Sequence, residues 1–217
     1  MFTGIVEEVG RIAAVREEGG NLRLALRAER VLEGMERGDS VAVGGACLTV
    51  VAHDEARFEV ELSRETVAKT APRWRVGESV NLERAVSASG RFGGHVVTGH
   101  IGGVGEVVDV RGEPGASVVI VRAPGAMSRY LIPKGSITVD GVSLTVVDVG
   151  GPAGSREDWP AERFSLWLIP HTLAVTTLGE LEPGSQVNLE ADVLAKYVER
   201  LTLMKAQERA APELRGS

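Results

Sequence analysis

The chain contains an internal repeat, and this repeat restricts the possible folds more than any single motif does. Four blocks of the first half return in the same order in the second half. The matched blocks are Thr3–Val6 with Thr98–Ile101, Gly45–Val51 with Gly141–Val147, Phe58–Thr66 with Phe164–Thr172, and Val80–Glu83 with Val187–Glu190. The spacing between the copies increases by about ten residues across Gly150 to Glu162, which predicts a longer loop in the second copy. The sequence therefore predicts two similar domains, with Gly93 to Gly105 as the junction.

Composition restricts the class of protein. The 217 residues are 43% hydrophobic and 25% charged, which suits two globular domains of about 100 residues each. A net charge of −6 argues against a nucleic-acid surface, and no apolar run is long enough for a membrane-spanning helix. Cys47 is the single cysteine, and the chain begins without a recognisable signal peptide, so we expect a reducing compartment, the cytoplasm. One cysteine and four scattered histidines form no metal-ligand cluster.

Short segments of alternating polarity dominate both copies, as in Asn21 to Arg27, where leucine occupies every second position. Six such segments per copy, separated by turns, predict an all-β fold with a closed antiparallel barrel in each half. The expected strands of the first copy are Gly4–Val15 with a bend at Gly10, Asn21–Arg27, Ser40–Val43, Cys47–Ala52, Phe58–Leu62 and Ser79–Arg84. Those of the second copy are Val104–Asp109, Ala116–Ala123, Ser136–Val139, Ser143–Val149, Phe164–Ile169 and Gln186–Glu190.

One longer helix is predicted at the end of the chain. Asp192 is a suitable N-cap, and Leu194, Tyr197, Val198 and Leu201 follow with helical spacing. This apolar stripe can pack on its own barrel or against other copies of the chain. Short helical turns are expected within Glu29–Arg37, Ser63–Thr70 and Met127–Leu131. The predicted domains are residues 1–96, 97–191 and 192–210, the last being an oligomerisation helix.

Small polar side chains recur at equivalent strand positions, where Cys47 and Thr49 correspond to Ser143 and Thr145. One interpretation is a row of hydrogen-bonding groups facing a planar heterocycle, and the other is ordinary strand propensity. Some positions differ and place extra ionisable groups in the second copy: His100 replaces Ile5, Lys134 replaces Gly38, Asp140 replaces Gly44 and His171 replaces Glu65. Most charged residues are simply exposed, so a surface role for each remains open.

Five of these blocks together resemble the riboflavin synthase family of the alpha-chain type. They are the start Met1–Glu7, Gly45–Val50, Gly93–Ile101, Lys134–Val146 and Ile169–Leu173. The resemblance runs from Met1 to about Leu203. It implies two six-stranded Greek-key barrels, a C-terminal helix and a homotrimer. It also implies a transferase of riboflavin biosynthesis that needs no metal or organic cofactor, with the active site between barrels of neighbouring subunits. The reaction is the dismutation of two 6,7-dimethyl-8-ribityllumazine molecules to riboflavin and 5-amino-6-(D-ribitylamino)uracil by four-carbon transfer.

The resemblance also implies which residues bind substrate. The first lumazine-binding barrel would use Gly4, Ile5, Val6, Cys47, Leu48 and Thr49 for the ring, and Glu61, Leu62, Ser63, Arg64, Glu65 and Thr66 for the ribityl chain. The second would use Gly99, His100, Ile101, Gly102, Ser143, Leu144, Thr145, Leu168, Ile169, Pro170, His171, Thr172 and Leu173. Lys134 would reach a ligand held by another subunit.

Chemical roles are also expected. His100, Ser143 and Thr145 would assist loss of a proton from the 7-methyl group, and Cys47 would act as or support a nucleophile. Phe2 would close over a ring, while Asp140 and Asp192 would orient hydroxyl groups. The alternative is a non-catalytic lumazine- or flavin-binding protein of the same fold, similar to the antenna proteins. Lumazine synthase is a possible partner. The insert Gly150–Glu162 is longer than the resemblance implies, and it would affect access only if it crossed a barrel mouth.

Overall fold

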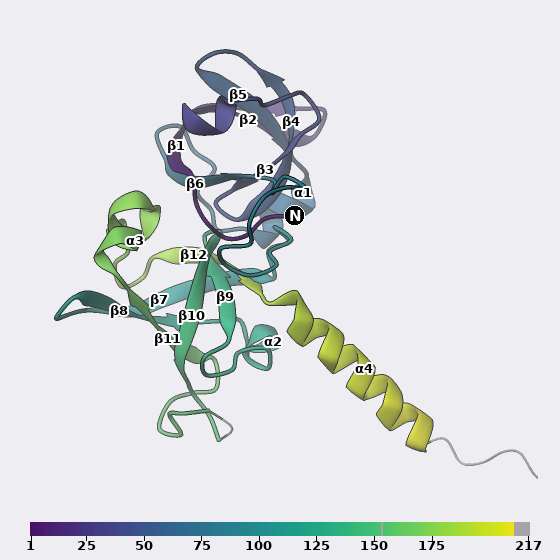
Figure 1. Ribbon diagram of the computed structural model, residues 1–217, viewed down its shortest axis with the longest axis vertical. Coiled ribbons are helices and arrows are strands. Elements are labelled where there is room, and N and C mark those ends of the chain that lie inside the picture. The colour runs from purple at the N-terminus through teal and green to yellow at the C-terminus, as the bar shows by residue number, and fades with distance from the viewer. Residues whose placement is uncertain (153, 211–217) are drawn as a thin grey trace, which may run out of the picture.

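The computed structural model describes residues 1–152 and 154–210 and consists of two closed six-stranded β-barrels followed by a helix (Figure 1). The predicted all-β class with one C-terminal helix is confirmed. Within the described residues, no helix has the length and apolarity needed to cross a membrane.

The first barrel pairs its strands in the order β1-β2-β5-β4-β3-β6, with β6 closing on β1. Two short helices lie between strands. The elements are β1 (Glu8–Glu18), β2 (Asn21–Arg27), η1 (Arg30–Leu32), β3 (Ser40–Val43), β4 (Ala46–His53), β5 (Arg57–Leu62), α1 (Arg64–Lys69) and β6 (Ser79–Arg84). The β3-β4-β5 meander inserted between β2 and β6 is a Greek-key arrangement.

The second barrel repeats this order with β7-β8-β11-β10-β9-β12. Its elements are β7 (Gly103–Glu113), β8 (Ala116–Arg122), α2 (Gly125–Ser128), β9 (Ser136–Val139), β10 (Val142–Val149), β11 (Arg163–Leu168), α3 (Pro170–Val175), η2 (Thr177–Glu180) and β12 (Gln186–Ala191). The chain ends in α4 (Val193–Ala210). The same strand order in both halves confirms the duplication that the repeat predicts.

Each barrel has a hydrophobic core of its own. Phe58, Leu24 and Leu26 are fully buried in the first barrel, and Phe164 and Leu166 in the second. Because inward side chains alternate with outward ones along each strand, the leucines of Asn21–Arg27 fill the first core, as their spacing predicts. Separate cores mean that each barrel is a domain, and contacts between them must be sought at their boundary.

Three details differ from the expectation, and a fourth was left open. The first strand begins at Glu8 rather than Gly4, because Phe2 instead forms an isolated bridge with Val97. The irregularity in that strand lies between Ile12 and Ala14 and not at Gly10. The helices α3 and η2 were not predicted. The insert Gly150–Glu162 joins β10 to β11 at the end away from Ser143, so it does not cross the face that carries the predicted ring-binding residues (Figure 1).

The barrels meet through contacts that occur twice. Gly45 and Gly141 lie backbone against backbone, because a Cβ on Gly45 would stand 2.6 Å from the nitrogen of Gly141. The amide of Asn81 donates to the Asp140 carbonyl at 3.0 Å, and that of Asn188 donates to the Gly44 carbonyl at 2.8 Å. This symmetry places a pseudo-twofold axis at the glycine contact. Strands β4 and β10, which carry the candidate site residues, therefore start beside this axis.

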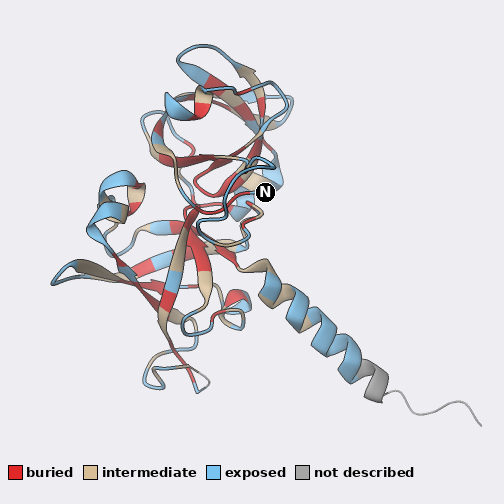
Figure 2. Ribbon diagram, viewed as in Figure 1, coloured by how far each residue is buried: buried red, intermediate tan, exposed pale blue. Residues whose placement is uncertain are grey.

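Helix α4 projects away from the second barrel (Figure 1). Asp192 caps it by accepting the backbone N–H of Leu194 at 2.9 Å, as predicted. Figure 2 shows that most of the helix surface is exposed, and the apolar stripe is part of that surface: Tyr197 is 63% exposed and Leu201 59%. The contact with the barrel is made by Glu199, which binds Tyr130 at 2.6 Å and Arg129 at 3.1 Å. Tyr197 and Leu201 lie on the side of the helix opposite Glu199 and face away from the barrel. Leu194 and Val198, the other two residues of the stripe, line a pocket between the helix and the barrel together with Tyr130 and Ile132.

Candidate active site

A carboxylate at the end of each barrel holds the segment that leads into that barrel. Glu83 accepts hydrogen bonds from the N–H and hydroxyl of Thr3 at 2.7 and 2.8 Å and from the N–H of Gly4 at 3.0 Å. Glu190 accepts the equivalent three bonds from Thr98 and Gly99, at 2.8, 2.6 and 2.9 Å. Burial raises the pKa of Glu83, and the donors on Thr3 and Gly4 oppose that shift. These carboxylates are therefore structural: they fix the position of two glycine-centred turns.

Each turn lies on the opposite barrel. The carbonyl of Gly4 accepts the N–H of Ser143 at 2.8 Å, and the carbonyl of Gly99 accepts the N–H of Cys47 at 2.9 Å. Both glycines have positive φ, +76° and +78°, and a Cβ on either would lie 2.5 Å from the Cβ of its partner. Only glycine permits this backbone conformation at so close an approach.

This exchange corrects the expected grouping of the ring sites. Gly4-Ile5-Val6 was assigned to the first barrel, but Val6 packs on the second core and Gly4 contacts Ser143. Gly99-His100-Ile101 was assigned to the second, but Ile101 packs on the first core. The grouping was wrong because sequence order does not show that the leading segments cross at the axis. Cys47–Thr49 therefore lies with Gly99–Ile101, and Ser143–Thr145 lies with Gly4–Val6.

His95 is the polar neighbour of Ser143 that sequence reasoning missed. Its Nδ1 lies 2.8 Å from the Ser143 hydroxyl, and its backbone N–H donates to the Thr3 carbonyl at 3.1 Å. Burial lowers the pKa of His95, while the charges of Asp192 and Glu190 oppose the shift. Its Nε2 is buried and has no hydrogen-bond partner within the described residues, which costs free energy and argues against a purely packing role. His95 is thus held neutral beside a hydroxyl and suited to accept its proton.

His95 lies in the connector before the second copy, three residues before Thr98, and belongs to none of the repeated blocks. The only available signal was that His95 belongs to the connector and stands outside the repeat. His95 lies beside Ser143, whereas Cys47, the residue equivalent to Ser143, contacts Gly99. The two halves are therefore chemically unlike.

His100, expected with Ser143 and Thr145 to assist loss of the methyl proton, lies apart from Ser143 within this chain. It is exposed, and its backbone N–H donates to the Thr98 hydroxyl at 3.3 Å on the Cys47 side. A role for His100 toward a ligand stays a prediction.

Alternation divides the predicted strand residues into two groups. Thr49 and Thr145 face outward and are exposed, and Cys47 and Ser143 are half-buried. The side chains of Leu48, Leu62 and Leu168 are buried in the barrel cores, and Leu144 is partly buried against the second core. A ligand on the outer face would meet these leucines only through backbone N–H and C=O groups.

The segments after β5 and β11 begin short helices. Ser63 caps α1 by accepting the Thr66 N–H at 3.1 Å, and Arg64 donates to the Gly20 carbonyl at 3.1 Å. The equivalent helix α3 starts with Pro170, whose fixed φ suits a first helical position. The remaining predicted residues of these loops are exposed or half-buried: Glu61, Glu65, Ile169, His171, Thr172 and Leu173. Both loops are accessible to a ligand chain on the outer face.

Two further predicted residues, Phe2 and Asp140, are buried. Phe2 is 0% exposed and packs with Ala42, Val97 and Cys47 between the barrels, so it cannot close over a ring without leaving that cluster. Asp140 is buried in an ion pair with Arg73 at 3.0 Å and accepts the Asn188 N–H at 2.8 Å. Burial raises the pKa of Asp140, and Arg73 opposes the shift. Because Asp140 is fully engaged between the barrels, its expected role in orienting substrate hydroxyls is wrong.

Lys134 lies in the loop before β9 and is exposed. Its φ of +66° is unusual for a residue with a side chain, and its backbone N–H donates to the Val146 carbonyl at 2.7 Å. This loop conformation directs an exposed cation to the surface of the second barrel. Its predicted contact with a neighbouring subunit's ligand stays a prediction.

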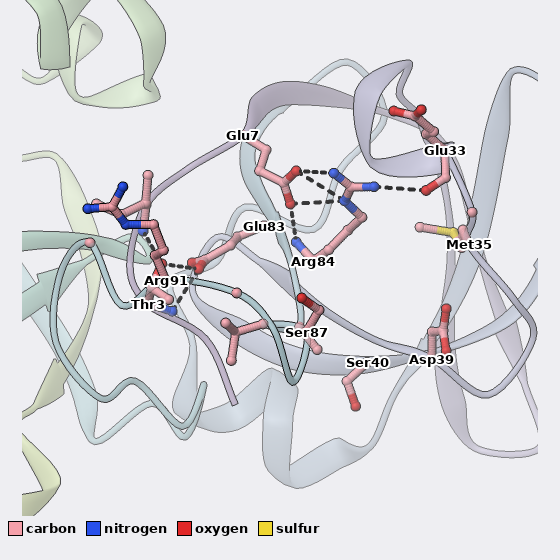
Figure 3. A pocket seen from close by; sticks show the side chains of 16 residues that line it. Thr3, Glu7, Glu33, Met35, Asp39, Ser40, Glu83, Arg84, Ser87 and Arg91 are labelled. Atoms are coloured by element: carbon pink, nitrogen blue, oxygen red, sulfur yellow. Dashed lines mark hydrogen bonds and ion pairs between the residues drawn. The ribbon is translucent and has the colours of Figure 1, made fainter.

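A cavity of about 630 Å³ lies between the end of the first barrel and the connector (Figure 3). Glu7 and Arg84 form a two-pronged ion pair in it, with contacts of 2.6 to 3.1 Å, and Arg84 also donates to the Glu33 carbonyl at 2.8 Å. Burial opposes ionisation of Glu7, yet Arg84 outweighs it and lowers the pKa of Glu7. These charges satisfy one another. Among the predicted ring-binding residues only Ile5 lines this cavity, so it is a structural feature rather than the candidate site.

Comparison with known proteins identifies the duplicated domain. The family model of the lumazine binding domain matches twice, at residues 3–85 and 98–192. Riboflavin synthase of Actinobacillus pleuropneumoniae is 40% identical over 99% of this chain and 95% of its own. The enzyme of Bacillus subtilis is 41% identical over 96% of this chain and 92% of its own, and that of Mycobacterium tuberculosis is 43% identical over 93% and 98%.

Solved structures agree with the sequence comparisons. The crystal structure of LumP complexed with 6,7-dimethyl-8-(1'-D-ribityl) lumazine has a TM-score of 0.75 at 26% identity, covering 88% of this chain and 99% of that one. LumP complexed with riboflavin has a TM-score of 0.76 with the same coverage. With two lumazine-binding domains and full-length relatives at about 40% identity, the chain belongs to the riboflavin synthase family.

Proposed function

We propose that the chain catalyses riboflavin formation from two molecules of 6,7-dimethyl-8-ribityllumazine, releasing 5-amino-6-(D-ribitylamino)uracil. Each barrel holds one lumazine on its outer face, and a four-carbon unit passes from one molecule to the other. The observation that carries this proposal is the pair of equivalent but unlike sites, one with His95 beside Ser143 and one with Cys47. A reaction that gives identical molecules different roles requires such a difference.

The Ser143 side suits the donor. A lumazine placed there loses a proton from its 7-methyl group, and the resulting anion is delocalised over the ring before it bonds to the acceptor. The Ser143 hydroxyl passes its proton to Nδ1 of neutral His95 and receives the methyl proton. The lowered pKa of His95 keeps Nδ1 able to accept near neutral pH.

The Cys47 side suits the acceptor. The Cys47 side chain is half-buried beside Gly99, and Thr49 is exposed two residues further along the same face. The Cys47 sulfur or a water bound there adds at C7 of the acceptor and makes its C6 the partner for the new carbon–carbon bond; the same nucleophile is expelled from C7 before riboflavin is released. Glu61 to Thr66 are positioned along the adjoining edge for ribityl hydroxyls.

A complete active site needs two subunits. Within one chain the Gly99 segment lies on Cys47 and the Gly4 segment lies on Ser143, so the two ring sites are separated by backbone. We propose that the exposed apolar stripe of α4 packs against other copies to form a homotrimer, which places the first barrel of one subunit against the second barrel of the next. Holding both lumazines together then supplies an effective molarity worth several kcal/mol, about 7–11 at best. A reducing compartment such as the cytoplasm suits Cys47, and lumazine synthase stays a predicted partner.

The direct test is incubation of the protein with 6,7-dimethyl-8-ribityllumazine, following riboflavin absorbance together with ligand stoichiometry. Riboflavin formation with two lumazine sites per chain is the expected result. His95→Ala is expected to slow turnover by about a hundredfold or more with little change in binding, whereas the exposed His53→Ala serves as the control. His100→Ala measures whether that residue acts at all.

The second candidate function is a non-catalytic lumazine or flavin carrier, favoured by the structural likeness to LumP. A carrier needs one occupied site, so tight binding at a single site without riboflavin would favour it. Retention of both Thr49 and Thr145, with a histidine added to one side only, favours the enzyme.

A further inference from the structure

The outer faces of the two barrels differ beside the ring-binding threonines. In the first barrel Val50 pairs with Val60, so the next outward positions, Thr49 and Glu61, lie opposite each other. In the second barrel Val146 pairs with Leu166, so Thr145 lies opposite Trp167. Trp167 therefore occupies in one copy the position that Glu61 occupies in the other.

The difference extends to the next strand. Glu61 pairs with Arg23 on β2, and the Arg23 Nη1 lies 3.5 Å from the Glu61 Oε1. Trp167 pairs with Val118 on β8. A charged pair beside the first site thus becomes an apolar pair beside the second. Figure 1 shows β8 and β11 adjacent in the second barrel, with α3 following β11.

Trp167 is also unusual among the tryptophans. Trp74 is 8% exposed and donates its indole N–H to Thr70 at 2.8 Å, and Trp159 stacks with Arg156 at 4.6 Å in the insert. Trp167 is 53% exposed on strand β11, and its neighbour Thr145 belongs to the proposed ring site. An indole offers a large flat surface with little rotational freedom, which suits stacking on a planar electron-poor heterocycle.

We propose that Trp167 is the stacking platform of the second-barrel site and sets its preference for flat bicyclic rings such as pteridines. The first barrel has the Glu61 carboxylate at the equivalent position, which binds its ligand through hydrogen bonds from ligand hydroxyl groups. This inference rests on the proposed function, because it takes Thr145 to line a lumazine site.

The test is calorimetric titration of the full-length protein with a lumazine analogue that carries oxygen in place of the 7-methyl group and so cannot react. Trp167→Ala is expected to weaken one of the two sites roughly two- to tenfold. Trp167→Phe retains a flat ring and should lose much less. Trp159→Ala, a tryptophan at the far end of the same hairpin, is the matched control and should bind as the unaltered protein does.

A second readout identifies the residue directly. The indole N–H resonance of Trp167, assigned by its absence in Trp167→Phe, should shift when ligand is added, while that of Trp159 stays in place. Unchanged affinity in Trp167→Ala, or an unmoved Trp167 resonance at saturation, would overturn the proposal. Loss of the oligomer in Trp167→Ala would also overturn it, because Trp167 would then be a subunit contact. Failure of the proposed function itself is distinguishable, since the unaltered protein would then show no second site.

Discussion

Gly4 and Gly99 are the residues at which the two barrels exchange their leading segments. The carbonyl of Gly4 accepts a backbone hydrogen bond from Ser143 at the start of β10, and that of Gly99 accepts one from Cys47 at the start of β4. Both glycines have positive φ, and a Cβ added to either would overlap the Cβ of its partner. The sequence showed that these glycines are equivalent. It did not show which strand each would contact, because that depends on long-range packing and not on local conformation.

A comparison of Gly99→Ala with Gly115→Ala separates the cost of the positive φ from the cost of the close contact with Cys47. Gly115 has nearly the same φ, +77° against +78°, but nothing within 4 Å of an added Cβ. The control should cost about 1–2 kcal/mol of unfolding free energy from backbone strain alone. Gly99→Ala should cost about 1–3 kcal/mol more, because the new methyl group overlaps Cys47. Urea denaturation measures both, and equal losses would contradict the close contact.

His95 predicts a pH-dependent stability. Its pKa in the folded chain is lowered below 6.5 by burial, so the folded state resists a proton that the unfolded state accepts. Stability is then complete above the unfolded value of 6.5 and is lost as pH falls from 6.5 toward the lower folded pKa.

The urea midpoint should fall more between about pH 7.5 and pH 5.5 in the unaltered protein than in His95→Gln. Glu83 and Asp140 have raised pKa values and act in the opposite direction, but they are present in both proteins and cancel in the comparison. The exposed His53→Gln is the control. Parallel pH profiles for the unaltered protein and His95→Gln would contradict a buried neutral histidine.

Among the secondary-structure elements, the strands were the most predictable. Alternating leucines placed Asn21–Arg27 correctly, because burial of one face leaves a period of two in the sequence. Helix α3 was missed, since Ile169–Val175 carries no helical apolar period and its start depends on Pro170. Side chains along a strand point alternately inward and outward, so only part of each predicted site motif can face a ligand. Leu48, Leu62 and Leu168 belong to these motifs, but their side chains fill the barrel cores.

Helix α4 tests the assembly at the scale of one element. Tyr197 and Leu201 of its stripe face away from the barrel, because Glu199 on the opposite side of the helix makes the barrel contact. Leu194 and Val198 line a pocket against the barrel. Leu201→Glu should therefore convert the proposed trimer to monomers and reduce riboflavin formation by about a hundredfold or more, with lumazine binding to each barrel largely kept. Light scattering and turnover report both effects. Arg200→Glu changes an exposed residue outside the stripe and is the control. A trimer that persists in Leu201→Glu would contradict this role.

At the scale of the whole molecule, duplication explains both the symmetry and the chemistry. The repeat predicted two barrels. They join where Gly45 contacts Gly141 and through two equivalent hydrogen bonds, from the Asn81 amide to the Asp140 carbonyl and from the Asn188 amide to the Gly44 carbonyl. The crossing of the leading segments and the position of His95 were beyond sequence reasoning, since one is a tertiary exchange and the other lies outside the repeat. The two proposed ring sites are similar in backbone and differ at His95, Cys47 and Trp167.

The measurement that tests the central claim most directly is a mixing experiment with two matched variants. Thr49→Arg blocks the outer face of the first barrel, and Thr145→Arg blocks the equivalent face of the second. Each variant alone should form no riboflavin. After dissociation and joint reassembly in equal amounts, random trimers should regain about a quarter of the normal activity, because one site in four then joins two intact barrels from different subunits. A mixture that stays inactive while mixed trimers form would contradict an active site shared between subunits.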